Sequence, residues 1–106
     1  MTDMEITIAC AKAFYGKAVR TEVGNALYVE PWDSANAIRY DPMHNDGQAM
    51  GLVKKFELLI GRNTNMLTKV KTWGVTCGNE KGDFEAESAD LNRAICECVA
   101  QMQEAK

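Results

Sequence analysis

The stretch Tyr40-Asp41-Pro42-Met43-His44-Asn45-Asp46-Gly47-Gln48-Ala49-Met50 places a proline turn, a helix start and several polar side chains within eleven residues. Asn45 or Asp46 can cap the helix, and Gln48 stands three residues after Asn45, at the capping-box position. An apolar stripe with helical spacing follows: Ala49, Met50, Leu52, Val53 and Phe56. The sequence therefore predicts a helix that ends near Glu57 and has a polar edge at its start.

Two further helices are predicted, one near each end of the chain. Thr2 and Glu5 have the spacing of a capping box, and Gly16 is a natural stop, so we expect a helix over about Asp3 to Tyr15. Ser88 is expected to cap a last helix. Its apolar stripe has a spacing of three and four residues: Leu91, Ala94, Ile95, Cys98, Val99 and Met102.

The segments on both sides of Gly24-Asn25 alternate apolar and polar residues and predict a hairpin. Register favours a three-residue loop, Gly24 to Ala26, because that loop pairs the apolar residues Val23 and Leu27 on one face. A two-residue loop would place Glu22 opposite Leu27 and mix polar with apolar side chains.

Further strands are expected after the hairpin and after the middle helix. Pro31 ends the second strand, because proline has no N–H to give to a ladder. The segment Leu58 to Ile60 enters a strand, and 61–65 is a cluster of turn-forming residues. Leu67 to Cys77 is rich in the Val, Thr and Trp typical of strands, and Phe84 to Ala86 predicts one more short strand.

Three amphipathic helices need a sheet to bury their apolar faces. We therefore expect an α+β fold, a small α/β sandwich in which an antiparallel sheet of about four to five strands is packed with three helices. The 106 residues are enough for one hydrophobic core, so residues 1–106 are expected to form a single domain.

Composition narrows the class of function. A net charge of −3 and a pI of about 5.1 argue against a protein that coats nucleic acid. The chain has no apolar run near the ~20 residues that span a bilayer, and its polar start, Met1 to Glu5, is unlike a secretory signal. We therefore expect an intracellular protein of the cytoplasm with no nucleic-acid or membrane partner. The cysteines fit that compartment as free thiols: Cys10, Cys77, Cys96 and Cys98.

Catalytic signatures are missing from the sequence. There is no phosphate loop and no nucleophile elbow, and His44 has no serine or cysteine beside it in sequence. Asp41 and Asp46 lack a third carboxylate nearby for a metal, and a single histidine argues against zinc. We expect a protein that is not an enzyme and uses no cofactor or metal; a small hydrolase built on His44 and Asp46 is the weakest alternative.

Aromatic and basic residues are the candidates for binding a ligand. Trp73 precedes Gly74, which would leave one indole face open to stack on a purine. Arginines can hold phosphates, and Arg93 lies in the first turns of the last helix, where the helix dipole also favours an anion. The expected ligand-binding set is Arg39, Tyr40, His44, Asp46, Trp73 and Arg93. Further candidates of the same kinds are Arg20, Trp32 and Arg62. The ordinary alternatives are core or interface aromatics, solvated arginines, and turn or cap residues.

Two stretches resemble a group of small phage and prophage proteins. Tyr40 to Ala49 has an aromatic residue, a proline two positions later, polar residues including Asp, and then Gly, a polar residue and Ala opening a helix. Glu85-Ala86-Glu87 and Arg93-Ala94-Ile95 in the closing helix also match. The segment from about Trp32 to Met102 is similar to the phage ABA-sandwich domain family. His44 stands where many members have Thr, Glu or Asp, and Gln48 where many have Asp.

The resemblance implies an α/β sandwich of about this size, and most members have no assigned role. Some small phage α/β proteins of similar layout are nucleotide sponges, which bind cyclic signalling nucleotides of the Thoeris and CBASS defence systems without cleaving them. We therefore expect a phage-encoded, non-enzymatic protein that sequesters a cyclic nucleotide second messenger to counter host defence. The alternatives are a phage accessory protein that binds a host protein through an exposed apolar edge, and an uncharacterised small structural domain. We also expect a homo-oligomer, because three apolar helix faces exceed what a thin sheet covers.

Overall fold

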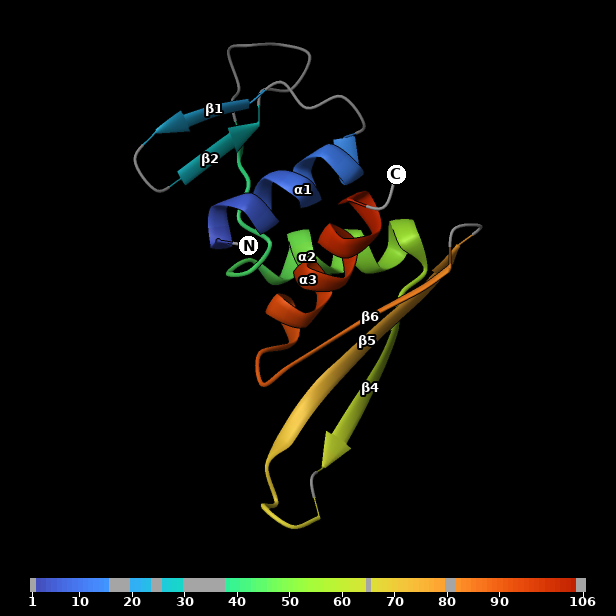
Figure 1. The fold of residues 1–106 in the computed structure, drawn as a ribbon. Coiled ribbons are helices and arrows are strands. Elements are labelled where there is room, and N and C mark those ends of the chain that lie inside the picture. Colours follow the sequence, from blue (N-terminus) through green and yellow to red (C-terminus); the bar gives the residue numbers. More distant parts are fainter. Residues whose placement is uncertain are drawn as a thin grey trace.

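Three helices lie between two three-stranded antiparallel sheets in the computed structural model, which describes residues 2–15, 20–23, 26–29, 38–64, 66–79 and 82–104 (Figure 1). The helices are α1 (Asp3–Tyr15), α2 (Asp46–Phe56) and α3 (Leu91–Glu104). The expected four- to five-stranded single sheet is wrong, because α1 and α3 bury their apolar faces against each other and the helices therefore separate the two sets of strands. The α+β class with three helices is confirmed.

The helix starts follow the local capping chemistry. In α1, the Thr2 Oγ1 accepts from the Glu5 N–H at 3.1 Å, and the Glu5 carboxylate accepts from the Thr2 N–H at 3.3 Å. In α2, the Asn45 Oδ1 accepts from the Gln48 N–H at 3.0 Å. The helix ends at Glu57, whose φ of 53° is left-handed and turns the chain into the next strand.

The larger sheet consists of β4 (Leu59–Thr64), β5 (Lys71–Asn79) and β6 (Gly82–Ser88). The turn expected at 61–65 is wrong, since β4 stays paired with β5 up to Thr64, with Gly61 opposite Gly74. Pairing across the sheet outweighs the local turn preference of Gly and Asn.

The start of α3 differs from the expected cap. Ser88 is the last residue of β6, and its hydroxyl accepts from the Asp90 N–H at 3.2 Å. The first helical backbone bond runs from the Ala94 N–H to the Asp90 carbonyl at 3.0 Å, so Asp90 occupies the cap position. The hydroxyl thus shapes the turn that precedes the helix.

The smaller sheet consists of β1 (Arg20–Val23), β2 (Ala26–Val29) and β3 (Ile38–Arg39). Its register pairs Val23 with Ala26, which leaves a two-residue loop, so the expected three-residue loop is wrong. Two-residue loops are the commonest hairpin connections, and this preference outweighs the side-chain pairing used for the prediction. Trp32 and the side chain of Arg20 lie outside the described residues.

The hydrophobic core lies where the three helices meet one face of the larger sheet. Its largest fully buried side chains include Leu52, Ile95, Val75 and Val99. The four cysteines are buried thiols outside any disulfide, and the thiol state is as expected; for instance, the Cys10 thiol donates to the Cys96 carbonyl at 3.3 Å. Among the described helices, none combines the length and hydropathy needed to cross a membrane.

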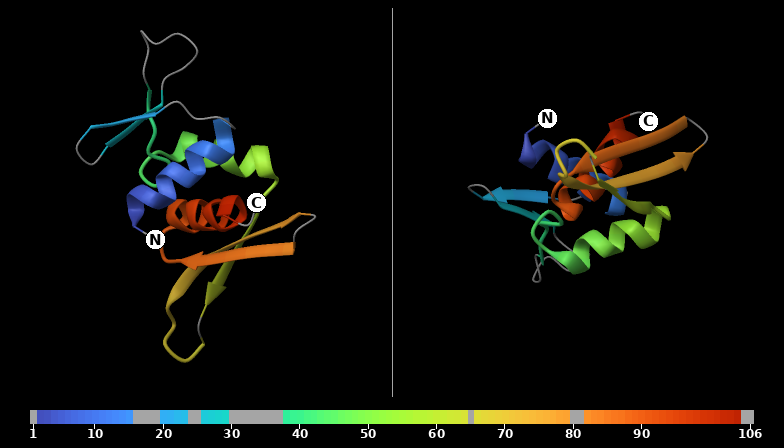
Figure 2. Two further views of the ribbon diagram at one scale, coloured as in Figure 1. Left: turned by 45° about the horizontal axis from the view of Figure 1, so that its top comes forward. Right: turned by 90° about the horizontal axis from the view of Figure 1, so that it is seen from below.

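The hairpin of β4 and β5 runs well past the helices, as two views show (Figures 1 and 2). We call residues 61–64 and 66–74 the arm, and the helices with the covered parts of β5 and β6 the body. The molecule is 51 Å long and 22 Å in its shortest dimension. At the tip of the arm, Met66 is 84% exposed and Leu67 is 95% exposed.

Candidate functional site

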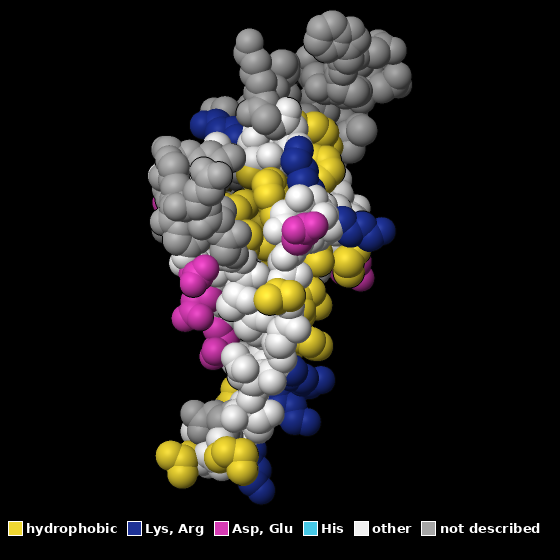
Figure 3. Space-filling view, turned by 90° about the vertical axis from the view of Figure 1, so that its right-hand side faces the viewer, with side chains coloured by type: hydrophobic (Ala, Val, Ile, Leu, Met, Phe, Trp, Pro, Cys, Tyr) yellow, Lys and Arg dark blue, Asp and Glu magenta, His cyan; other side chains and the backbone are white. Residues whose placement is uncertain are grey.

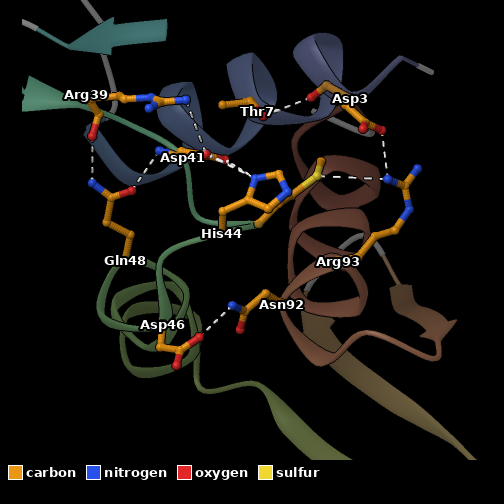
Figure 4. Close-up of polar contacts among 10 residues, drawn as sticks. Asp3, Thr7, Arg39, Asp41, His44, Asp46, Gln48, Asn92 and Arg93 are labelled. Carbon is orange, nitrogen blue, oxygen red and sulfur yellow. Dashed lines mark hydrogen bonds and ion pairs between the residues drawn. The ribbon is translucent and has the colours of Figure 1, made fainter. Parts of the chain in front are cut away.

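Two of the six expected ligand residues, Arg39 and His44, lie around Asp41 at the start of α2 (Figure 4). The His44 Nδ1 lies 3.0 Å from each carboxylate oxygen of Asp41, and the Arg39 guanidinium lies 3.8 Å from one of them. Gln48 fixes this turn, because its side chain accepts from the Asp41 N–H at 2.7 Å and donates to the Arg39 carbonyl at 2.9 Å. Both basic side chains therefore already face a carboxylate of the protein.

Tyr40 belongs to the core and not to a ligand surface. Its side chain is 2% exposed and packs edge-on against Tyr15, with ring centroids 5.6 Å apart, and beside Phe14. Burial raises the pKa of its hydroxyl well above the usual range. A side chain enclosed in this way offers no face to a base, so Tyr40 leaves the candidate set.

Arg93 of α3 forms an ion pair with Asp3 of α1 and so links these two helices. Its guanidinium contacts the Asp3 carboxylate at 2.7 Å and the Glu97 carboxylate at 2.7 Å, and it also lies 3.9 Å from the Met43 sulfur (Figure 4). The hydrogen bond to Asp3 raises the pKa of Arg93 further. With two carboxylates already in contact, Arg93 serves the α1–α3 interface and has little charge left for a phosphate.

Asp46 and Trp73, the remaining two, come together at one hollow of about 430 Å³. The hollow lies between the first turn of α2, the start of α3 and the indole of Trp73. The Asn92 amide of α3 donates to the Asp46 carboxylate at 2.8 Å and ties the two helix starts together (Figure 4). Met50 adds an apolar wall that is 44% exposed.

The sequence predicts that a helix start binds an anionic ligand, but the protein places its own negative charges at this hollow. Asp46 occupies the first turn of α2, and Asp90 precedes the first turn of α3, so each helix N-terminus already has a carboxylate. These carboxylates complement the helix dipoles themselves. The helix ends therefore suit ligand groups that donate hydrogen bonds better than they suit a phosphate.

Arg62, a secondary candidate in the sequence, stacks on the indole of Trp73. The two residues are cross-strand partners in β4 and β5, and the guanidinium carbon lies 5.1 Å from the ring centroid. In the described part of the chain, no carboxylate forms an ion pair with Arg62. This arginine thus keeps its charge available beside the indole that lines the hollow. Its place next to Trp73 follows from the strand pairing, which spacing along the chain does not reveal.

A metal centre is not formed by the described side chains: among them, no group of three or more His, Cys, Asp or Glu residues is placed to hold an ion. The chemistry that the hollow can offer is aromatic stacking, hydrogen-bond acceptance by Asp46 and Asp90, and one cation at its margin.

No family model matches the chain, and no curated protein does. Among solved structures, the fold is similar to the 2.0 Å crystal structure of a phage protein from Bacillus cereus ATCC 14579. The TM-score is 0.65 at 19% sequence identity, and the match covers 100% of this chain and 90% of that chain. At this identity the likeness shows the fold: helices packed on a three-stranded antiparallel sheet.

Proposed function

We propose that this chain is a phage-encoded, non-enzymatic protein that sequesters a cyclic nucleotide second messenger and so counters host antiviral defence. The observation that supports the proposal most is the gathering of one indole and two carboxylates around one hollow, Trp73, Asp46 and Asp90, with the guanidinium of Arg62 stacked on that indole. The likeness of the fold to a phage protein supports the phage origin.

The base of the nucleotide would stack on the indole of Trp73. Stacking on an aromatic side chain contributes about 1–3 kcal/mol per base. Asp46 and Asp90 would accept hydrogen bonds from the amino or imino groups at the edge of a base, because ionised carboxylates only accept. Adenine, guanine and cytosine carry an exocyclic amino group, which uracil lacks, so the hollow favours these three bases over uracil.

The phosphates would lie toward the arm, away from the two aspartates. Arg62 stacks on the indole that lines the hollow, and a guanidinium can hold a phosphate with two parallel hydrogen bonds. The volume of about 430 Å³ lies within the usual range of small-molecule sites, about 300–1,000 Å³. Sequestration uses stacking, hydrogen bonding and charge alone, and it leaves the ligand intact.

The test is a thermal-shift and calorimetry screen with cyclic dinucleotides, cyclic trinucleotides and cyclic ADP-ribose isomers. A useful sponge needs a Kd of ~10⁻⁹ M, about −12 kcal/mol. Ligand at about 1,000 times Kd would then stabilise the fold by about 4 kcal/mol. The ligand recovered by chromatography is expected to be unchanged. If no compound in the panel shifts the melting temperature, or if the bound compound is cleaved, the proposal is wrong.

Two variants locate the site once a ligand is found. Arg62→Ala is expected to weaken binding at least about tenfold, since a charge-assisted contact to phosphate contributes about 1.5–3 kcal/mol. Arg39→Ala is the matched control, because Arg39 is an exposed arginine that pairs with Asp41 away from the hollow. Equal losses in the two variants would place the ligand elsewhere on the protein.

A further inference from the structure

The tip of the arm combines exposed apolar and basic side chains. Met66, Leu67 and Val70 are 84%, 95% and 53% exposed, and Lys69 and Lys71 lie among them in sequence. Surface methionine, leucine and valine gathered at the end of a protruding hairpin mark a surface made for contact. The basic residues indicate that the surface bound by the tip is acidic.

The two faces of the larger sheet have opposite charge. In β5, Val75 and Cys77 face the helices, so by alternation Lys71 and Trp73 lie on that inner face, and Arg62 of β4 pairs with Trp73 there. The outer face has three carboxylates in a row along β6: Asp83, Glu85 and Glu87. Figure 3 shows the separation, with Lys and Arg along one side of the arm and at its tip, and Asp and Glu on the opposite side nearer the helices.

The outer face also has a hollow, whose described lining residues all belong to β4, β5 and β6. Its volume is about 480 Å³, and its floor includes the facing glycines Gly61 and Gly74, with Leu59 and Glu85 at the rim. A Cβ built on Gly61 meets nothing within 4 Å, which shows open space above the backbone. Across the hollow, the Asn63 amide reaches over Gly74 and donates to the Glu87 carboxylate at 3.0 Å.

We infer that the arm tip of one copy of this chain docks on the acidic outer face of a second copy. Apolar side chains of the tip enter the glycine-floored hollow, and Lys69 and Lys71 meet the carboxylates of β6. Charge complementarity favours a second copy as the partner. Each chain carries a basic apolar tip and an acidic hollow, and the two can meet only when they belong to different molecules. Within one chain the two lie at different positions along the same extended sheet, and so they cannot touch (Figures 1 and 3).

The contact joins two different surfaces, so it is heterologous. Repetition of such a contact forms a ring if the rotation closes and a chain of copies if it does not. The interaction depends on exposed charges and is therefore expected to weaken as salt shortens the Debye length from about 10 Å at 0.1 M toward about 3 Å at 1 M.

The experiment measures the mass of the protein in solution by size-exclusion chromatography with light scattering. At about 0.05 M NaCl, where the Debye length exceeds 10 Å, the wild type is expected to exceed the 11.7 kDa of one chain and to fall toward it at about 0.5 M. The arm variant K69E/K71E and the face variant E85K/E87K are each expected to be monomeric at low salt. K12E/K54E, which makes the same charge change on exposed helix positions, is expected to associate like the wild type.

A mixture of the two reversed variants is the decisive measurement. The arm of E85K/E87K is still basic and the face of K69E/K71E is still acidic, so the mixture is expected to associate again, which a variant that fails to fold cannot do. A wild type that stays monomeric at low salt would overturn the inference and leave the tip to another partner, such as a host protein. Reversed variants that associate alone, or a mixture that stays monomeric, would overturn it as well.

Discussion

The body and the arm are built on different physical principles. In the body, side chains such as Leu52 and Ile95 are almost fully buried, and burial of a large apolar side chain contributes about 1.5–3 kcal/mol. In the arm, every residue of β4 is exposed, and the hairpin is held mainly by its backbone ladder. The difference shows where sequence is constrained by folding and where it is free to serve binding. Regions with few buried contacts also open at lower free energy than the core.

Truncation of a core side chain gives the largest expected effect. Ile95→Ala in α3 should lower the free energy of unfolding by about 3 kcal/mol, because it leaves a cavity between helix and sheet. Met66→Ser at the arm tip should change it by less than about 0.5 kcal/mol, since that side chain is exposed. Urea denaturation followed by circular dichroism measures both. Similar losses would show that body and arm are not distinct.

Alkaline pH should destabilise the body. Burial, with Cys77 and Glu85 nearby, raises the pKa of Cys98 to about 11 from an ordinary value of 9.0. The folded state therefore favours the neutral thiol. This stabilisation is complete below pH 9.0 and is lost as pH rises toward about 11, a difference of about 2–3 kcal/mol. Burial raises the pKa of Tyr40 too, which adds in the same direction.

Urea titrations at several values between pH 8 and pH 11 measure how steeply the free energy of unfolding falls as pH rises. Cys98→Ala should reduce the dependence on pH, whatever its own loss of stability, while Met66→Ser in the arm should keep the full dependence. A slope that is unchanged in Cys98→Ala would assign the effect to other groups.

Asparagine-to-alanine changes compare the two regions with one chemical alteration. Asn45→Ala removes the cap of α2 and should cost about 1 kcal/mol. Asn63→Ala removes the exposed contact with Glu87 across the arm and should cost only a few tenths of a kcal/mol. Chemical denaturation of both variants measures the two losses in the free energy of unfolding. A larger loss for Asn63 would mean that the arm contributes to the core.

The smallest effects are expected where the backbone is left-handed. Glu57 ends α2 at φ 53°, and Lys69 lies in the arm at φ 58°. Glycine adopts this conformation without the steric cost of a Cβ, so Glu57→Gly should raise the global stability by about 0.5–1 kcal/mol. Lys69→Gly should slow hydrogen exchange in the arm and leave the free energy of global unfolding unchanged. Equal global gains would mean that arm and body unfold together.

The starts of α1 and α2 could be predicted because capping chemistry is local, whereas α3 is capped by Asp90 and not by the expected Ser88. Thr2 with Glu5, and Asn45 before α2, make the expected bonds. The turn expected after Gly61 and the register of the first hairpin could not be predicted, because both depend on partners in other strands. Gly61 by itself predicts a turn, and only its cross-strand pairing with Gly74 shows that it lies in a strand.

The candidate site was only partly accessible to sequence reasoning for the same reason. Asp46 and Trp73, two of the six candidate residues, line one hollow. The neutralisation of Arg93 comes from Asp3, 90 positions away in the chain, and no spacing rule contains that information. Tyr40 opens the polar turn in sequence, yet it points into the core.

The pairing of α1 with α3 has a consequence for synthesis. Cys10 lies against Cys96, and Arg93 holds Asp3, so α1 packs mainly on α3, which is made much later. Until α3 emerges, α1 must keep its apolar side uncovered, whereas β4, β5 and β6 are sequential neighbours that can pair as they are made. A chain truncated after residue 90 should thus be a substrate for chaperones and proteases, with a formed hairpin and no closed core.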